Sequence, residues 1–129
     1  MDIVEFREYC LSLPRVAECT PFDETTLVMK VGGKIFAAAD MEQFDAFVVK
    51  CDPDKAVALR DRHPEIGEAH HWNKRWWNAV SVVGDLPDSF LRRQIIQSYL
   101  LVIRRNVTPR ALREEILAEA AGLLPEAEG

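Results

Sequence analysis

The fold of this 129-residue chain is decided by the stretch LVMKVGGKIFAA, which covers residues 27–38. Two runs rich in apolar, β-branched and aromatic residues flank the pair Gly32-Gly33. Glycine accepts the positive φ angles that a two-residue hairpin turn requires. The stretch therefore predicts a β-hairpin with strands at 27–31 and 34–38.

Downstream of the hairpin, residues 44–51 predict a third strand. The connection to it is shorter than the roughly dozen residues that a parallel crossover needs, so we expect antiparallel pairing. Asp52-Pro53 then has the pattern of a helix start, with Asp as N-cap and Pro in the first helical position. This helix is expected to end near His63, before Pro64.

Farther along, residues 70–72 and 77–83 predict a second strand pair, connected by residues 73–76. Asp88 is expected to cap a long helix, because apolar side chains recur at helical spacing after it. Thr108-Pro109 is expected to cap a last helix that runs toward Gly122.

Upstream of the hairpin, residues 2–13 predict an amphipathic helix that Pro14 ends. Asp2 and Glu5 are spaced as a capping box. Residues 15–25 are polar and are expected to be irregular.

The expected fold class is thus α+β, with an antiparallel sheet of about five strands packed against N- and C-terminal helices. The expected order is helix, three strands, helix, two strands and two helices. We expect a single domain over residues 1–122 and a frayed tail over residues 123–129.

Composition and charge exclude several classes of protein. The chain has three cysteines without CxxC spacing, no long apolar run and no basic, apolar N-terminus, so we expect a cytoplasmic protein without disulfides or a membrane anchor. The net charge is −5, but its distribution is uneven. Residues 70–113 carry an excess of six positive charges, while the segments on either side are acidic. A local basic surface is therefore compatible with the negative net charge of the whole chain.

Several separated motifs resemble the MmcQ/YjbR family of bacterial proteins. They are Pro21-Phe22, Gly33-Lys34-Ile35-Phe36-Ala37, Asp52-Pro53, His70-His71-Trp72-Asn73-Lys74, Trp77, Leu86-Pro87-Asp88 and Gln97-Ser98-Tyr99-Leu100-Leu101-Val102. The resemblance spans roughly residues 3 to 105 and implies a frataxin-like fold with two hairpin-like wings. It also implies a DNA-binding role, but supplies no catalytic residues.

The strongest candidate site is the segment His70 to Asn78, which combines basic, amide and aromatic side chains. Lys74 and Arg75 can neutralise phosphates, Asn73 and Asn78 can hydrogen-bond sugars or bases, and Trp76 can stack on a base. Arg92 and Arg93 are candidates for extending this surface, as are the later arginines Arg104, Arg105, Arg110 and Arg113. The alternative interpretation is a structural hairpin, with Trp72 and Trp77 in the core and a solvated Lys-Arg tip. For the arginines, the alternative is a set of charges spread around helices, with Arg104-Arg105 complementing the helix dipole.

Other chemistries lack a signature in the sequence. Adjacent His70 and His71 on a strand would point to opposite faces, and neither HExxH nor paired CxxC occurs, so we predict no metal site and no cofactor. Frataxin is linked to iron through an acidic first helix. The first helix here also carries acidic residues, Asp2, Glu5 and Glu8, but this similarity is an analogy alone. No catalytic residues are predicted, because no GxSxG or nucleophile–base pattern is present.

Two functional hypotheses follow. The first is a non-enzymatic protein that binds DNA weakly and without sequence specificity, through the residues around Asn73–Asn78 and the neighbouring arginines. The second is a binding module for a protein partner or a small ligand, with the same Trp and His cluster as its recognition surface.

Overall fold

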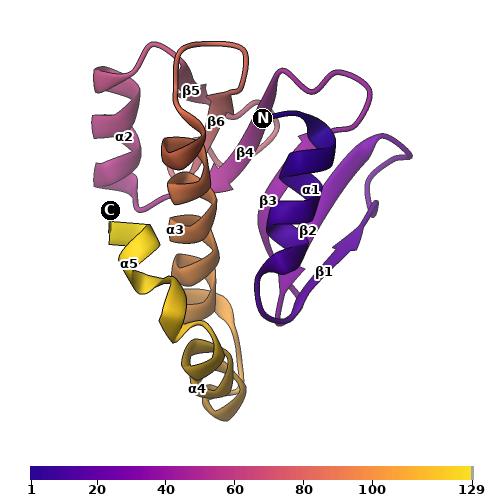
Figure 1. Ribbon diagram of the computed structural model, residues 1–129, viewed down its shortest axis with the longest axis vertical. Helices are drawn as coiled ribbons and strands as arrows, with labels where there is room; N and C mark the ends of the chain where they lie inside the picture. Colours follow the sequence, from indigo (N-terminus) through magenta and orange to yellow (C-terminus); the bar gives the residue numbers. More distant parts are fainter. Residues whose placement is uncertain (129) are drawn as a thin grey trace.

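A computed structural model describes residues 1–128 and contains one six-stranded antiparallel sheet, in the order β1-β2-β3-β4-β6-β5. The strands are β1 Val16–Cys19, β2 Thr26–Val31, β3 Lys34–Asp40, β4 Ala46–Lys50, β5 Ile66–Glu68 and β6 Trp77–Ser81. The helices are α1 Ile3–Ser12, α2 Pro53–Arg62, α3 Asp88–Asn106, α4 Arg110–Glu119, the 3-10 turn η1 Ala121–Leu123 and α5 Leu124–Glu128. The predicted α+β class is confirmed, with six strands instead of about five (Figure 1).

The hairpin predicted from residues 27–38 is confirmed. β2 and β3 pair antiparallel from Thr26–Asp40 to Val31–Lys34. Gly32 and Gly33 form the turn with φ angles of +56° and +78°. The turn therefore uses the conformational freedom that glycine alone provides without strain.

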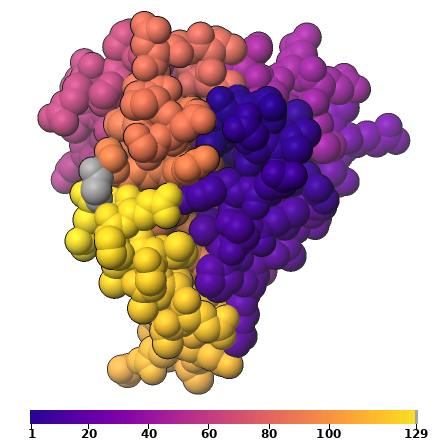
Figure 2. Space-filling model, viewed as in Figure 1, coloured from indigo at the N-terminus to yellow at the C-terminus, as the bar shows by residue number. Residues whose placement is uncertain are grey.

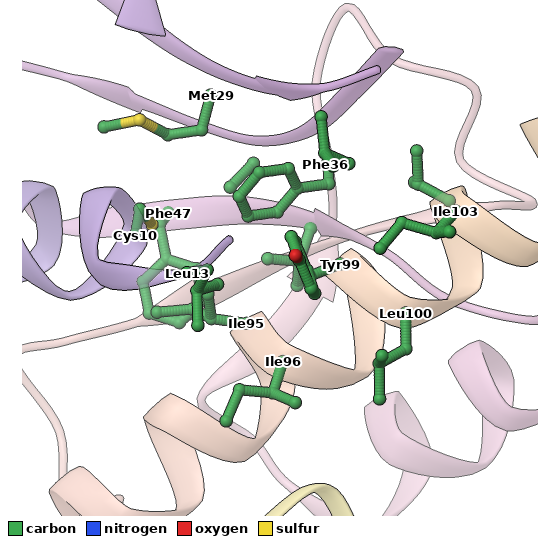
Figure 3. Packing of buried hydrophobic residues seen from close by; sticks show 14 of the residues in the cluster. Cys10, Leu13, Met29, Phe36, Phe47, Ile95, Ile96, Tyr99, Leu100 and Ile103 are labelled. Carbon is green, nitrogen blue, oxygen red and sulfur yellow. The ribbon is translucent and has the colours of Figure 1, made fainter. Parts of the chain in front are cut away.

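Helices α1 and α3 cover one face of the sheet, where the hydrophobic core lies (Figures 1 and 3). Phe6 of α1 stacks on Phe47 of β4, with ring centroids 5.4 Å apart. Tyr99 of α3 meets the Phe36 ring edge-on at 5.3 Å. The Tyr99 hydroxyl donates to the Pro14 carbonyl at 2.7 Å, so burial of this ring leaves no polar atom unpaired.

The outer surface of this layer is helical. Figure 2 shows α1 in indigo beside the start of α3, with α5 in yellow below them and α4 at the lower end.

The predicted capping box at the start of α1 is present, because Asp2 Oδ1 accepts from the Glu5 amide and Glu5 Oε1 accepts from the Asp2 amide. No helix within residues 1–128 is long and apolar enough to cross a bilayer.

Two strand predictions were wrong. Residues 16–19, predicted to be irregular, form the edge strand β1 and pair with β2. The partner of β6 is β5 at residues 66–68, whereas residues 70–72 lie in the turn-rich connection after it. The hairpin that carries the candidate site therefore has a longer loop, residues 69–76, than the sequence predicted.

The predicted helix starts were close to the observed ones. Asp52 occupies the N-cap of α2 but makes no side-chain capping bond. Asp88 is the first residue of α3, with Pro87 at the N-cap, and its Oδ1 accepts from the N-terminal ammonium of Met1. Pro109 holds the N-cap position of α4, so Thr108 does not cap it.

The structure describes residues 123–128 of the segment that the sequence predicts to be a frayed tail, and Gly129 lies outside the described residues. Residues 124–128 form α5, in which Ala127 is buried. The Ala127 carbonyl accepts from Gln97 Nε2 of α3 at 2.7 Å. A buried side chain and a hydrogen bond thus hold this segment against α3.

Candidate functional site

The loop over residues 69–76 is shaped by Asn73. Its carbonyl accepts from the Trp76 and Trp77 amides, both at 3.0 Å, and its Oδ1 accepts from the Arg75 amide at 3.0 Å. These bonds form a tight turn in which Lys74 and Arg75 are exposed. The Asn73 side-chain oxygen is therefore used within the protein, while the two cations face solvent.

Asn78, also predicted to contact nucleic acid, is buried in the structure with 1% of its surface exposed. Its Oδ1 accepts from Arg60 Nη1 at 2.7 Å, and its Nδ2 donates to the Ala56 carbonyl at 3.3 Å. Asn78 thus joins β6 to α2, and the structure gives it no access to a nucleic acid.

Arg92 and Arg93 lie away from the loop. The Arg92 guanidinium sits 5.5 Å from the Tyr9 ring centroid, and that of Arg93 lies 5.9 Å from the Phe90 ring. The Trp76 ring is instead beside Arg105, at the other end of α3. Twelve residues of helix separate Arg93 from Arg105, which corresponds to about 18 Å. The two arginine pairs of α3 therefore do not form one surface.

The cations beside the tryptophans are Arg105 and Lys50, not Arg92 and Arg93. The Arg105 guanidinium lies 4.5 Å from the Trp76 ring centroid, and Lys50 Nζ lies 5.3 Å from the same ring. Lys50 Nζ is also 6.0 Å from the Trp77 ring and donates to Asn106 Oδ1 at 2.9 Å. Both cations are within the distance at which a ring face attracts positive charge.

A shallow groove of about 380 Å³ continues this site across the sheet. Its lining residues include Lys30 and Lys34 of the β2–β3 hairpin together with Lys50, Trp72 and Trp77. We call the set Lys30, Lys34, Lys50, Arg105, Trp72, Trp76 and Trp77 the basic–aromatic face. Phe22 extends its aromatic part, because its ring meets Trp72 edge-on at 6.2 Å and Trp72 lies 4.7 Å from Trp77.

The cations of the basic–aromatic face lack acidic partners among the described residues. The ion pairs there join Met1–Asp88, Arg7–Glu18, Arg15–Glu115, Arg15–Glu119 and Arg110–Glu114. Burial lowers the pKa of Lys50, and the positive charge of Arg105 lowers it further. Protonated Lys50 is therefore held where its charge is poorly compensated, a situation that a bound anion would relieve.

Sequence reasoning found the tryptophans of this face but missed three of its lysines. Lys30, Lys34 and Lys50 lie in strands whose other residues are mostly apolar. A charged residue at a strand end is common, so the pattern alone did not mark them as functional. The pairing of β2 with β3, of β3 with β4 and of β4 with β6 brings them to the tryptophans.

The described residues form neither a cluster of metal ligands nor an activated cysteine nucleophile. Within residues 1–128, no three His, Cys, Asp or Glu side chains are grouped as metal ligands would be. The described chain has its three cysteines free, and burial raises the pKa of the Cys10 and Cys51 thiols. A raised pKa disfavours the thiolate that a cysteine nucleophile needs.

Comparison with known proteins gives a consistent result. The model of the family described as YjbR matches residues 11–101. The Escherichia coli K12 protein called "Uncharacterized protein YjbR" is 30% identical, over 88% of this chain and 96% of its own length. "Uncharacterized protein YbdF" of Escherichia coli O157:H7 is 33% identical, over 75% of this chain and 80% of its own.

Solved structures show the same architecture. The crystal structure of a Deinococcus radiodurans protein with a DUF419 domain has a TM-score of 0.82 and 35% identity, covering 89% of this chain and 87% of that one. A Pseudomonas syringae protein, with a TM-score of 0.67 and 21% identity, covers 78% of this chain and 98% of its own, and is similar in fold alone. The names of these proteins state no ligand or reaction.

Proposed function

The chain belongs to the YjbR family, and we propose that it binds single-stranded DNA weakly and non-specifically through the basic–aromatic face. Binding by this face requires no catalysis, so we propose a non-enzymatic role. The three free cysteines and the bacterial relatives support a cytoplasmic location.

One observation carries the proposal. Lys50 and Arg105 come from a strand and a helix, converge on Trp76, and have no carboxylate within ion-pair distance among the described residues. Phosphate groups supply the missing negative charge, and their binding releases counterions from the nucleic acid. Lys30 and Lys34 extend the positive charge along the groove.

The aromatic residues favour a single strand over a duplex. Bases of a single strand are free to stack on aromatic side chains, whereas bases of a duplex already stack on each other. Trp72 and Trp76 are partly exposed, and Phe22 has 62% of its surface exposed. A groove with lysines along it and tryptophans beside it is the arrangement typical of sequence-tolerant single-strand binding.

Helix α3 offers a matched pair of variants to test the proposal. Arg92 and Arg105 are both exposed, and each lies over an aromatic ring, but only Arg105 belongs to the basic–aromatic face. We expect Arg105→Gln to weaken binding of a fluorescein-labelled oligothymidylate in anisotropy titrations at low salt. Arg92→Gln removes the same charge from the opposite end of the helix and should leave the affinity unchanged.

The loop is tested in the same titrations with the double variant Lys74→Glu/Arg75→Glu. Because both side chains are exposed and lie close to Trp76 in sequence, we expect a loss of affinity that shrinks as salt is added. Equal loss in Arg92→Gln and Arg105→Gln would contradict the site. Absence of binding by the unaltered protein at low salt would contradict the function.

A further inference from the structure

A second hollow lies between α2, α3, α5 and the end of β4. It is a pocket of about 250 Å³. None of the tryptophans lines it, but Lys50 lines both this pocket and the groove. Helix α3 lines it with Gln94, Gln97, Leu101 and Arg104. Residues at these spacings share one side of a helix, so a continuous strip of α3 forms the pocket wall.

The central feature of this pocket is Gln94. Only 7% of its surface is exposed, yet its side-chain amide makes no hydrogen bond to any residue of the described chain. The nitrogen and oxygen of this amide are not among the fully buried polar atoms that lack a partner, so they reach the space of the pocket. Since Gln94 lines the pocket, its donor and acceptor are available to a molecule inside it.

The neighbouring polar groups are already engaged. Gln97 donates from Nε2 to the Ala127 carbonyl and accepts at Oε1 from Lys55 Nζ at 2.9 Å. Asn78 is bonded to Arg60 and to the Ala56 carbonyl. Gln94 is therefore distinguished from the other two amides of the pocket by having its hydrogen-bonding capacity free.

The charges and apolar surfaces of the pocket indicate the class of ligand. Lys55 and Arg104 line it and are in no ion pair within residues 1–128, while Leu100, Leu101 and Leu124 supply apolar contact. Asp52 and Glu128 also line it, so the lining carries both positive and negative charges and does not select anions by charge alone. Its volume is below the range typical of drug-sized ligands.

We propose that this pocket binds a small aliphatic carboxylate that carries a hydroxyl or carbonyl group. The carboxylate pairs with Lys55 or Arg104, the second polar group bonds to the Gln94 amide, and the aliphatic part contacts the leucines. The proposal rests on Gln94, Lys55 and Arg104, none of which belongs to the basic–aromatic face, although Lys50 of that face also lines the pocket.

The test uses two probes of the same shape, 2-hydroxy-4-methylpentanoate and its uncharged amide, 2-hydroxy-4-methylpentanamide. Amide chemical shifts of the full chain are followed by NMR during titration with each probe. We expect saturable shifts from the carboxylate in α2, α3 and α5, and weaker binding of the amide because it lacks the negative charge. No saturable shift with the carboxylate up to about 10 mM would overturn the proposal, since this is beyond ordinary weak binding.

Gln94→Met provides the decisive variant, because methionine has a similar shape but no amide. We expect it to weaken binding of the carboxylate by about tenfold, the usual scale for loss of one hydrogen bond. Gln43→Met is the matched control, since Gln43 is exposed in the β3–β4 connection and distant in sequence from the pocket residues. Unchanged affinity in Gln94→Met would overturn the role of this residue.

Thermal unfolding separates a binding role for Gln94 from a structural one. Because the Gln94 amide bonds to no described residue and its polar atoms reach the pocket, Gln94→Met should leave the Tm without ligand about unchanged. A clear fall in Tm would show that the amide stabilises the fold and would overturn the proposal.

Discussion

Ser98 links helix α3 to the two central strands through a single hydroxyl group. Its Oγ donates to the Phe36 carbonyl at 2.6 Å and accepts from the Lys50 amide at 2.8 Å. In the register of β3 and β4, Phe36 and Lys50 would form the next pair after Ala37 and Val49. The serine hydroxyl therefore bonds to backbone groups at the point where the ladder stops.

We predict that Ser98→Ala destabilises the protein by about 2–3 kcal/mol, because it leaves a buried carbonyl and an amide without a partner. Urea denaturation followed by circular dichroism measures this change. Ser89→Ala, at an exposed site near the start of the same helix, is the control and should cost much less. Equal effects of the two substitutions would contradict the bridging role of Ser98.

Lys50 should give the protein a distinct pH dependence. Its pKa is lowered from 10.5 in the folded state, so the folded protein loses this proton at a lower pH than the unfolded chain does. The unfolded state then binds more protons in that interval, and stability rises with pH. Relative to Lys50→Met, which cannot titrate, the unaltered protein should gain stability as pH rises toward 10.5.

The measurement for Lys50 is urea unfolding of both proteins at neutral and at alkaline pH. The groups common to both proteins, including Tyr99, whose pKa burial raises to about 12, cancel in the comparison. A difference in stability that does not change with pH would contradict the environment described for Lys50.

At the scale of elements, the β2–β3 turn is fixed by a contact with the α3–α4 connection. A Cβ atom on Gly32 would lie 2.9 Å from both Cγ atoms of Val107, whereas one on Gly33 would meet nothing within 4 Å. Both glycines have positive φ angles, so an alanine at either position is strained. An alanine at position 32 would therefore also overlap with Val107, whereas an alanine at position 33 would not.

The two alanine substitutions should therefore differ in cost. We predict about 1 kcal/mol for Gly33→Ala from backbone strain alone, and about 2–3 kcal/mol for Gly32→Ala because steric overlap is added. Thermal or urea unfolding compares them directly. Equal costs would show that Val107 moves aside freely and that the turn is not held by α3–α4.

The elements that the sequence predicted well have strong local signals. The double-glycine turn, the capping box at Asp2 and Glu5, and the apolar spacing in α3 each lie within a short stretch of chain. Strand β1 was missed because it is only four residues long and lies between Pro14 and Pro21, in a segment whose other residues are largely polar. Strand β5 contains Gly67, whereas the aromatic residues 70–72 have a stronger strand pattern.

The candidate site was predicted only in part, because only some of its features are visible as local patterns in the sequence. The tryptophans and the Lys74-Arg75 pair lie together in sequence, and their exposure is a local property. Arg92 and Arg93 were included because they follow in the same basic segment, but a helix places them at the end opposite Arg105. The contribution of Lys50 requires knowledge of sheet order, which no local pattern supplies.

At the scale of the whole molecule, an acidic protein presents a local cluster of cations. Arg15 illustrates how the other charges are used, because it pairs with Glu115 and Glu119 of α4. In contrast, Lys30, Lys34, Lys50 and Arg105 have no ion-pair partner in the described part of the chain. Four phosphate contacts predict a plot of log affinity against log salt with a slope of about −3 for single-stranded DNA.

The slope is measured by anisotropy titration over a series of salt concentrations. We expect Lys34→Gln to reduce its magnitude by about 0.7, the value for one phosphate contact. Arg7→Gln is the control, because Arg7 pairs with Glu18 and does not line the groove. A slope near zero would indicate that binding does not depend on phosphate neutralisation.

The placement of the tryptophans has a practical consequence. All three lie within residues 72–77, and Trp72 and Trp77 line the groove, whereas no tryptophan lines the pocket that contains Gln94. The intrinsic fluorescence of the protein is therefore a label-free signal from one surface. Bases that stack on the tryptophans should quench this emission strongly. A carboxylate in the pocket touches no tryptophan and should change the emission less, through Lys50 alone, so the size of the change distinguishes the two sites.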